Sequence, residues 1–488
     1  MPNPRPILLR PRRPRVLPGL AGALSAIAIA GCETLPPNIA VPIPTAYRAG
    51  GGGASKPLPR DWVTAFGSAE LNRLVAGALA ENLDIEAAVA RIQEAEAQAV
   101  IAGAALFPNL GANTDVSRTQ ASGGGRVGGS TFASNRFGLG LTASYELDLF
   151  GKNRFAASAA EEAARGRRFN RDTLALSTVA AVANTYFAVL SSQDRLRIAG
   201  DNLAIASRVL EAVRGRLRVG TGTALDTAQQ ESVVASQRAR VPPLVQQVEQ
   251  NRNVLAVLLG RTPESVRVRG GSLDALRAPA VRPGLPSELL LRRPDIAAAE
   301  ADLASAEASV ASARAAFFPS IQLTGSGGFQ SAALRSLLGP NALVYSVAAG
   351  LTQPIFDGYA LQGQLDLQRG RTAEFAALYR RAIIQSLADV ENALIAVRQN
   401  TEFEARQRDA VAASRRALDI TETRLREGTI DVVTLFTVQT TLFSAQDALA
   451  GARFLRFQAL VSLYQALGGG WTQSRAVPVA VAAEPAAP

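Results

Sequence analysis

The chain has 488 residues, enough for a large core, with 51 lysines and arginines against 41 aspartates and glutamates, no histidine and one cysteine. This composition excludes Cys/His zinc sites, His-based triads, Cys–His nucleophile pairs and any disulfide within the chain. The net charge of +10 falls to +5 without the five arginines of the first 31 residues, since 46 basic residues then face 41 acidic ones. The remaining basic residues are spread along the chain without stacking aromatics, which disfavours nucleic-acid binding.

Residues 1–31 are predicted to be a lipoprotein signal peptide. Arginines precede the apolar run VLPGLAGALSAIAIAG, which is short and rich in small residues for a transmembrane helix. The run ends in IAGC, and small residues before a lone cysteine resemble a bacterial lipobox, which implies cleavage before Cys32 and acylation of its thiol. The alternative is a buried core cysteine. The residue after the cysteine influences lipoprotein sorting. Glu33 favours sorting to the outer membrane, because an aspartate at this position would favour retention in the inner membrane.

Residues 32–67 and 471–488 are predicted to lie outside the folded core. The first segment includes PPNIAVPIPTAYRAGGGGASKPLPRDW, which is rich in proline and glycine and has no helical or strand period. It is expected to form a lipid-anchored, extended tether. The last segment ends in AVPVAVAAEPAAP and is predicted to be disordered.

The sequence between these segments is an internal repeat, with a first half at 68–281 and a second half at 282–470. The phrase LFPNLGANT at 106–114 returns as FFPSIQLTG 211 positions later, and RLRVGT at 216–221 returns as RLREGT 208 positions later. This period is too long for a solenoid unit, so it indicates a duplicated, domain-sized half.

Each half begins with an Ala-rich helical stretch, at 70–106 and 289–317, which the Phe-Pro dipeptide is expected to end. Two strand-like stretches follow. In the clearest, 136–149, apolar residues from Phe137 to Leu149 occupy every second position. Its length suits a membrane-spanning barrel strand of about 9–11 residues, although a soluble sheet with one wet face alternates similarly. The segments 117–135 and 330–342 suit loops on the far side of a barrel.

Very long helices are expected next, because proline is absent from 109–241 and again from 355–477. Residues 152–218 would span roughly 100 Å, with a return helix at 223–259, and 361–426 and 431–467 form the second pair. Small apolar residues favour close helix packing in a coiled-coil-like wall. A soluble coiled coil would show the same pattern. Gly220 and Gly428 suit helix C-caps, and Thr223 to Asp226 resembles a capping box. A proline-dotted connection is expected from Pro242 to Pro294.

An ordered set of phrases resembles the TolC-like outer-membrane efflux protein family, and the resemblance covers essentially all of residues 62–470. The set comprises the lipobox, FPxL or FPxI, LFGK and IFDG, LADVENAL at 387–394, and RxGT followed by TTLFSAQDAL at 440–449. More narrowly, it resembles the lipoprotein branch that partners resistance–nodulation–division (RND) pumps. The resemblance implies a mixed α and β fold. Four strands per subunit would form a trimeric, twelve-stranded outer-membrane β-barrel, continuous with a long periplasmic α-helical barrel.

The function implied is the outer-membrane channel of a tripartite efflux system. It would passively conduct substrates from an inner-membrane RND transporter and a periplasmic adaptor to the cell exterior, without enzymatic activity, cofactor or metal. Connector elements near 242–288 would form a belt midway. Two alternatives stay open: the outer-membrane duct of a type I protein secretion system, and a periplasmic coiled-coil scaffold without a pore. Glu146 and Asp148 are interpreted as groups lining the pore, and the cargo is not determined.

The resemblance also assigns residues to the far tip of the helices. Contact with the adaptor maps to Val219, Gly220, Thr221, Glu427, Gly428 and Thr429. The closed aperture would lie nearby, with Asp226, Asp431, Thr434 and Thr437 as candidates. The family's basic link partner falls at Ile430, and its acidic constriction falls at the two threonines, so this chain departs from the pattern. The alternative is helix capping for Asp226 and a solvated charge for Asp431.

Overall fold

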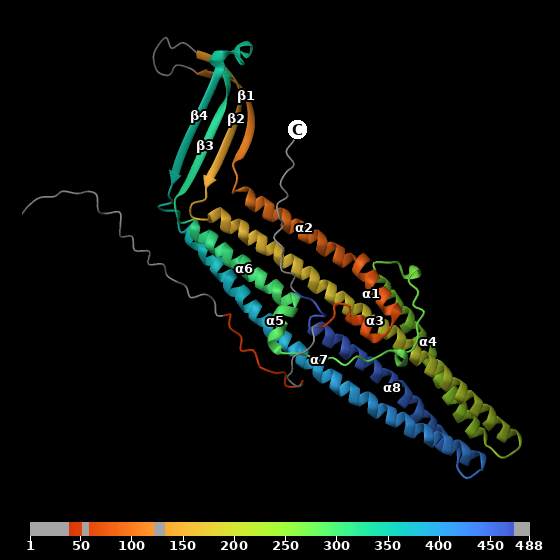
Figure 1. Cartoon of the computed structure of the whole chain (residues 1–488). Helices are drawn as coiled ribbons and strands as arrows, with labels where there is room; N and C mark the ends of the chain where they lie inside the picture. The colour runs from red at the N-terminus through yellow and green to blue at the C-terminus, as the bar shows by residue number, and fades with distance from the viewer. Residues whose placement is uncertain (1–38, 51–57, 122–131, 473–488) are drawn as a thin grey trace, which may run out of the picture. The chain divides into compact units, whose positions relative to one another are not determined.

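The computed structural model describes residues 39–50, 58–121 and 132–472; Cys32 and the signal peptide therefore lie outside the described residues. The elements follow one another in the same order twice (Figure 1). They are α1 Ala69–Glu81, α2 Leu83–Ala104, β1 Asn109–Ala121, β2 Phe132–Leu147, α3 Lys152–Arg218, α4 Ala224–Leu258, α5 Leu289–Arg292, α6 Pro294–Ala315, β3 Ser320–Ser331, β4 Leu343–Thr352, α7 Ala360–Arg426 and α8 Val432–Ala466. A short 3₁₀ helix, Trp62–Phe66, precedes α1, and others lie between the later elements.

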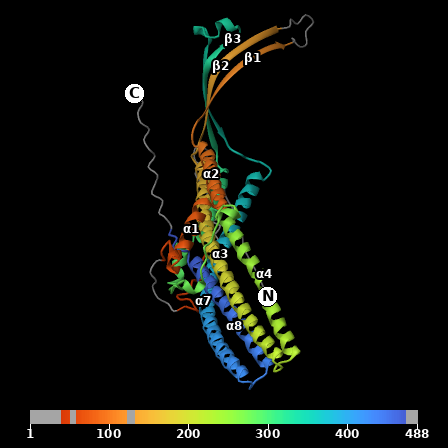
Figure 2. The same cartoon turned by 90° about the vertical axis from the view of Figure 1, so that its right-hand side faces the viewer.

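The long helices have the predicted lengths. α3 and α7 each have 67 residues, and α4 and α8 each have 35. Figure 2 shows the α3–α4 and α7–α8 hairpins running together, away from the sheet. By length and composition α3 could cross a membrane, but half of its most apolar window is buried inside the protein. We interpret it as a core helix, because it packs against α2, α4, α6 and α8.

The end of α4 meets the start of α2 through Asn82. The amide nitrogen of its side chain donates to the carbonyl oxygen of Leu258 at 2.8 Å. The amide oxygen accepts from the backbone N–H groups of Asp84 and Ile85, so it also caps α2. A bidentate ion pair between Arg261 and Glu81, at 2.6 Å, supports the same junction.

The second half builds the matching junction between α8 and α6 from different residues. Arg293 donates to the carbonyl oxygen of Ala466 at 3.1 Å and pairs with Asp295 and Asp389. Glycine is required after both return helices. A Cβ on Gly260 would lie 2.1 Å from the carbonyl oxygen of Glu81, and one on Gly468 would lie 1.9 Å from that of Arg292.

These junctions correct two sequence predictions. The stretches 70–106 and 289–317 are not single helices, because each breaks where a return helix arrives, at Asn82 and at Arg293. Arg293 precedes Pro294, which disfavours helical geometry at that residue. The connection predicted from Pro242 to Pro294 begins later than expected. Pro242 and Pro243 lie inside α4, as the predicted return helix at 223–259 requires, so the connection begins after Leu258. Both prolines are exposed, on a helix whose opposite side packs along α3.

The four strands form one antiparallel sheet in the order β1-β2-β3-β4. β1 begins directly after Pro108 and β3 directly after Pro319, as predicted from the repeated phrases. The first hairpin is longer than expected: its strands extend to Ala121 and from Phe132, and only 122–131 lies outside the described residues. β2 ends at Leu147 because the next residue, Asp148, accepts from the backbone N–H groups of Asn153 and Arg154 and caps α3.

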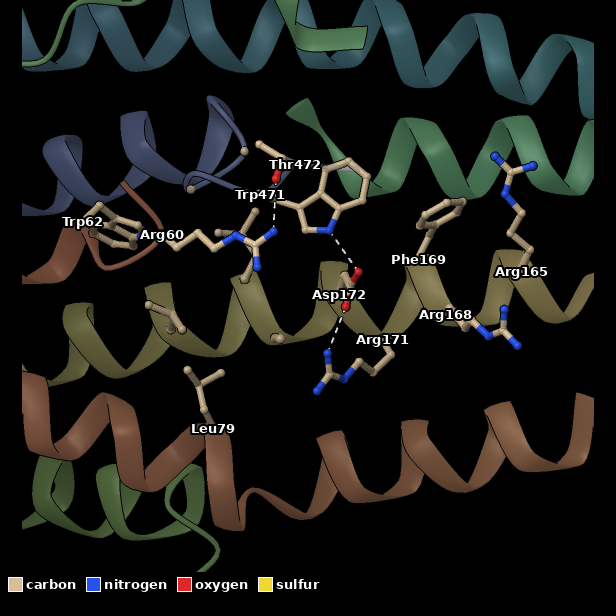
Figure 3. Close-up of a pocket in the computed structure, with 15 residues that line it drawn as sticks. Arg60, Trp62, Leu79, Arg165, Arg168, Phe169, Arg171, Asp172, Trp471 and Thr472 are labelled. Atoms are coloured by element: carbon tan, nitrogen blue, oxygen red, sulfur yellow. Dashed lines mark hydrogen bonds and ion pairs between the residues drawn. The ribbon is translucent and has the colours of Figure 1, made fainter. Parts of the chain in front are cut away.

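An aromatic core joins the short helix before α1 to the long helices. Trp62 stacks on Tyr464 with ring centroids 4.7 Å apart, and Phe66 lies 5.1 Å from Phe187. The tether predicted to end at 67 is therefore wrong at its end, because Trp62–Phe66 is a buried 3₁₀ helix. The predicted tail is likewise wrong at its start, since the indole N–H of Trp471 donates to Asp172 at 2.9 Å (Figure 3).

Ion pairs around a buried carboxylate link the connection between the halves to the α7–α8 hairpin. Glu404 on α7 pairs with Arg408, Arg453 and Arg456, and Arg453 also pairs with Asp274 at 2.5 Å. Burial by itself would raise the pKa of Glu404, but the hydrogen bond from Arg456 and the nearby positive charges hold that pKa below its usual value.

Replacement of Asn82 tests the first junction. Asn82→Ala removes the α2 cap and leaves the Leu258 carbonyl without this partner, so the free energy of unfolding should fall by about 1–2 kcal/mol. Arg91→Ala is the matched control, because Arg91 is an exposed residue of the same helix. Thermal melting of the purified proteins measures both, and equal melting temperatures would contradict this role of Asn82.

Candidate functional site: the open sheet and the hairpin turns

One face of the sheet is mostly apolar. Directly opposed residues of an antiparallel sheet share a face, and the register opposes Leu110 to Ala143, Val116 to Phe137, and Ala112 to Leu141. The same face continues across the other strands through the pairs Leu139–Phe329, Tyr145–Leu323, Leu147–Ile321, Ile321–Leu351, Gly325–Val347 and Gly327–Tyr345. Much of it is uncovered in the single chain, with Tyr345 83% and Val347 84% exposed.

The other face is polar or glycine-rich. It includes Asn113, Thr142, Ser144, Thr324, Ser326 and Gln330. Arg136 lies on this face, where its side chain contacts Asp115 at 3.8 Å and donates to Gln330 at 2.8 Å. A sheet with one uncovered apolar face and one polar face is the expected wall of a water-filled membrane pore. Glu146 contacts Lys152 at 2.5 Å, and Asp148 caps a helix, so neither is a free acid in the described chain.

The apolar face has the height of a membrane. The eleven residues of β2 paired with β3, from Phe137 to Leu147, cover about 33 Å along the strand at ~3.3 Å per residue. A barrel tilt of about 40° reduces this to about 25 Å, the usual apolar height of an outer-membrane barrel. Exposed aromatic residues lie at the end of the apolar band where the strands join the helices: Phe107, Phe150, Phe318, Phe356 and Tyr359. Such a girdle is typical of the membrane–water interface.

The predicted adaptor-contacting residues lie in the two hairpin turns, at the end of the helices away from the sheet (Figure 1). In the first turn, Gly220 has φ of +77°, and the N–H and hydroxyl of Thr221 both donate to the carbonyl oxygen of Arg216. The second turn repeats this geometry: Gly428 has φ of +73°, and Thr429 donates twice to Arg424. Positive φ explains glycine at both positions.

The remaining tip residues, Val219 and Glu427, are the exposed C-terminal caps of α3 and α7. The two turns are held near each other by a small cluster in which Val213 of α3 packs with Val432 and Phe436 of α8. The structure thus brings all six tip residues to one end of the helical layer, as predicted.

Two of the aperture candidates, Asp226 and Asp431, cap the N-termini of the return helices. Asp226 and Thr223 form a capping box, with Thr223 N–H donating to the carboxylate at 2.9 Å and Asp226 N–H donating to the hydroxyl at 3.1 Å. Asp431 is the N-cap of α8, and it accepts from the N–H and the hydroxyl of Thr434 at 2.8 and 2.6 Å. These hydrogen bonds, that of the hydroxyl first, hold the pKa of Asp431 below its usual value.

Both aspartates therefore lie near the turns, and each already has a local structural role. Thr437 lies one turn further along α8 and donates to the carbonyl oxygen of Val433 at 3.1 Å. Sequence reasoning treated Asp431 as a solvated charge in its alternative; the Asp-x-x-Thr spacing at 431–434 was the missed signal of a cap.

A cavity of about 970 Å³ lies beside α3, where the segment with Arg60 and Trp62 approaches Trp471 and Thr472 (Figure 3). Several arginines line it, and those of α3 are already paired with carboxylates: Arg165 with Glu162, Arg168 with Glu96, and Arg171 with Asp172. Among the described residues there is also no group of three or more side chains suited to hold a metal ion.

The comparisons with known proteins agree with this geometry. A family model described as "Outer membrane efflux protein" matches residues 74–261 and 285–469, which together are more than half of the chain. The chain belongs to the outer membrane efflux protein family. The two matched segments are the two repeats of this efflux protein, each with its strand pair and its helical hairpin.

Named relatives cover nearly the whole efflux protein. It is 38% identical over 443 residues to the pyoverdine export outer membrane protein OpmQ of Pseudomonas aeruginosa, covering 90% of this chain and 93% of OpmQ. It is 30% identical over 459 residues to the cation efflux system protein CusC of Escherichia coli, covering 92% and 98% of the two chains.

Solved structures agree as well. The outer-membrane channel OprN has a TM-score of 0.83 and 29% identity, covering 89% of this chain and 98% of OprN. The MtrE outer membrane channel of Neisseria gonorrhoeae in its open state has a TM-score of 0.81 and 32% identity, covering 89% and 97%. The predicted fold class and the predicted function are confirmed. The efflux protein is a duplicated, mixed α and β channel subunit, and it is the outer-membrane component of an efflux system.

Proposed function

We propose that three copies of this protein form one passive duct, and that the protein has no enzymatic role. The observation that carries the proposal is the open sheet: β1 and β4 are edge strands, and the apolar face between them is uncovered. Lipid offers no partner for unpaired backbone groups, so a membrane sheet has to close on itself. Four strands are too few for a pore, whereas twelve strands from three copies enclose one.

The helices supply a second contact between copies along the same edges. α2 packs on α3, α3 on α6 and α6 on α7, so α2 and α7 are the outer helices of this layer. They continue the two edge strands, β1 and β4. Both carry exposed apolar side chains, with Val100 and Ile101 on α2 at 74% and 73% and Ile384 on α7 at 55%. Burial of these side chains against a neighbouring copy would extend the barrel through the helical region.

We retain the predicted boundaries of the repeats, 68–281 and 282–470, as part of this proposal. The family match supports them, because its two segments fall inside them. The connection between the repeats, together with the segment near Trp62, lies against the middle of the long helices, which suits a belt around the duct.

The two hairpin turns are proposed to contact a periplasmic adaptor, which links the duct to an inner-membrane RND transporter in a tripartite system. Support comes from their shared geometry: two exposed turns of nearly the same sequence give three copies six similar docking positions. A photoreactive residue at Thr221 or Thr429 would cross-link to the adaptor in cells, whereas the same residue at Asp201, an exposed position within α3, would not.

The lipid anchor is proposed at Cys32. The lipobox-like IAGC supports it, and two acyl chains with a membrane barrel would hold the protein firmly in the outer membrane. Labelled palmitate should enter the wild-type protein and not Cys32→Ser; equal labelling of both proteins would exclude the site.

The cargo is left to the transporter in this proposal. OpmQ is named for pyoverdine and CusC for cations, although both align along nearly the whole chain. Their names also support efflux over the alternative of a protein secretion duct. In this proposal the duct conducts the cargo, and selection of the cargo occurs upstream, in the transporter.

The duct proposal predicts a detergent-dependent trimer that conducts ions. Purified full-length protein should migrate as a trimer that heating converts to a monomer, and it should form conducting channels in planar bilayers. Migration without heating, together with single-channel recording, measures this. A water-soluble monomer that gives no channels would refute the proposal.

We also propose that Asp226 and Asp431 contribute negative charge to the closed aperture, which predicts weaker cation preference after removal of either carboxylate. Asp226→Asn and Asp431→Asn keep a helix-capping side chain but remove one charge per copy, and three-fold symmetry removes three charges from the ring. The ratio of cation to anion permeability in single channels should fall. Asp201→Asn is the control, because Asp201 is exposed on α3 far from the turn. Unchanged conductance and preference in both variants would exclude an acidic ring.

A further inference from the structure

The apolar face of the sheet ends in an arginine at the end away from the helices. Val116 opposes Phe137 on that face, and the next pair of the same face is Arg118 with Asn135. The register is uninterrupted from Asn109 to Ala121, so strand alternation places Arg118 on the apolar side. A guanidinium there stands at the boundary of the lipid-facing band.

Arg118 differs from its neighbour on the opposite face. Arg136 is one residue away in the register, since it opposes Ser117, and it has partners in Asp115 and Gln330. Arg118 is exposed, and within the described parts of the chain it has neither an ion pair nor a side-chain hydrogen bond. Its five N–H donors have no partner among the described residues and can bind a ligand outside the protein.

A second such arginine lies in the connection between β3 and β4, at the same end of the sheet. Arg335 is exposed and, among the described residues, also lacks a charged partner. Leu334 and Leu338 beside it are 67% and 72% exposed. Exposed leucines flanking an arginine suit the boundary between acyl chains and headgroups, where the apolar side chains enter the lipid and the charge stays at the polar level.

The height of Arg118 matches the phosphate level of the outer leaflet. The apolar band of about 25 Å ends near Phe137, and Arg118 lies one opposed pair beyond, about 5 Å higher after the tilt. The aromatic residues at the strand–helix junctions mark the opposite boundary. A long cationic side chain at this level can reach headgroup phosphates without entering the hydrocarbon.

The proposed trimer brings the two arginines to one seam, and this step rests on that proposal. If β4 pairs with β1 of the next copy, Arg335 precedes the strand on one side of the seam, and Arg118 of the partner subunit lies on the strand at the other side. Each trimer would then have three equivalent seams, each with two guanidinium groups facing the outer leaflet.

We propose that Arg118 and Arg335 bind phosphate groups of the phosphorylated glycolipid that forms the outer leaflet. The guanidinium group matches phosphate in a bidentate geometry, and such charge-assisted hydrogen bonds are among the strong ones. The lipid-facing position of Arg118 selects a membrane lipid over a soluble anion, which would be reached from the polar face. The site would attach each seam between copies to the surrounding lipid.

The experiment uses purified full-length trimer in detergent, with bisphosphorylated lipid A as the probe. Native mass spectrometry gives the number of lipids bound and their apparent affinity. Arg118→Gln and Arg335→Gln should each weaken binding by about tenfold. Arg136→Gln is the matched control, since that arginine lies at the same height on the polar face, and it should bind as the wild type does.

Three results would overturn the proposal: equal affinity of the wild type for lipid A without phosphates, an equal loss with Arg136→Gln, or competition by inorganic phosphate at low millimolar concentration. The last would indicate a site for a free anion. The wild-type comparison of the two lipids decides the matter even if a variant fails to assemble. A wild-type protein that forms no trimer would refute the duct proposal, whereas a conducting trimer without preference for the phosphorylated lipid would refute only this inference.

Discussion

The structure of this efflux protein depends on one constraint, which is that backbone hydrogen-bonding groups have no partner in lipid. The subunit has a four-stranded sheet with two open edges and one uncovered apolar face. For a single copy, the open edges leave backbone groups without partners in lipid, whereas the apolar face is unfavourable only in water. Closure by neighbouring copies pairs the edges and leaves the apolar face toward lipid, and the outer helices α2 and α7 continue the same two edges. The pore is therefore a property of the assembly, and each chain carries only a part of its wall.

The second organising feature is the pair of junctions in the middle of the helical layer. Two return helices end where two shorter helices begin, and the terminal carbonyl groups need partners there. Asn82 provides one solution and Arg293 the other, although the repeats share little sequence at these positions. Gly260 and Gly468 allow the chain after each return helix to pass close to the backbone carbonyl groups of Glu81 and Arg292. The duplication thus conserved the geometry and changed the chemistry that maintains it.

The turns at the far end show how local and assembly roles coincide. Gly220 and Gly428 reverse the chain with positive φ, and Asp226 and Asp431 cap the helices that follow. Acidic caps on exposed turns cost little, and they lie close to the three-fold axis proposed here. The same residues can consequently set the turn in each copy and the electrostatics of the aperture in the trimer.

The sequence by itself determined the elements whose causes are local. Alternation after Pro108 and Pro319 identified the strands, long intervals without proline gave α3 and α7, and the glycine phrases located the turns. Only the tertiary structure decided the breaks at Asn82 and Arg293, the burial of Trp62 and Phe66, and the hydrogen bond from Trp471 to Asp172. Those features depend on contacts between residues far apart in the chain, where packing and the need to satisfy helix ends outweigh local propensity.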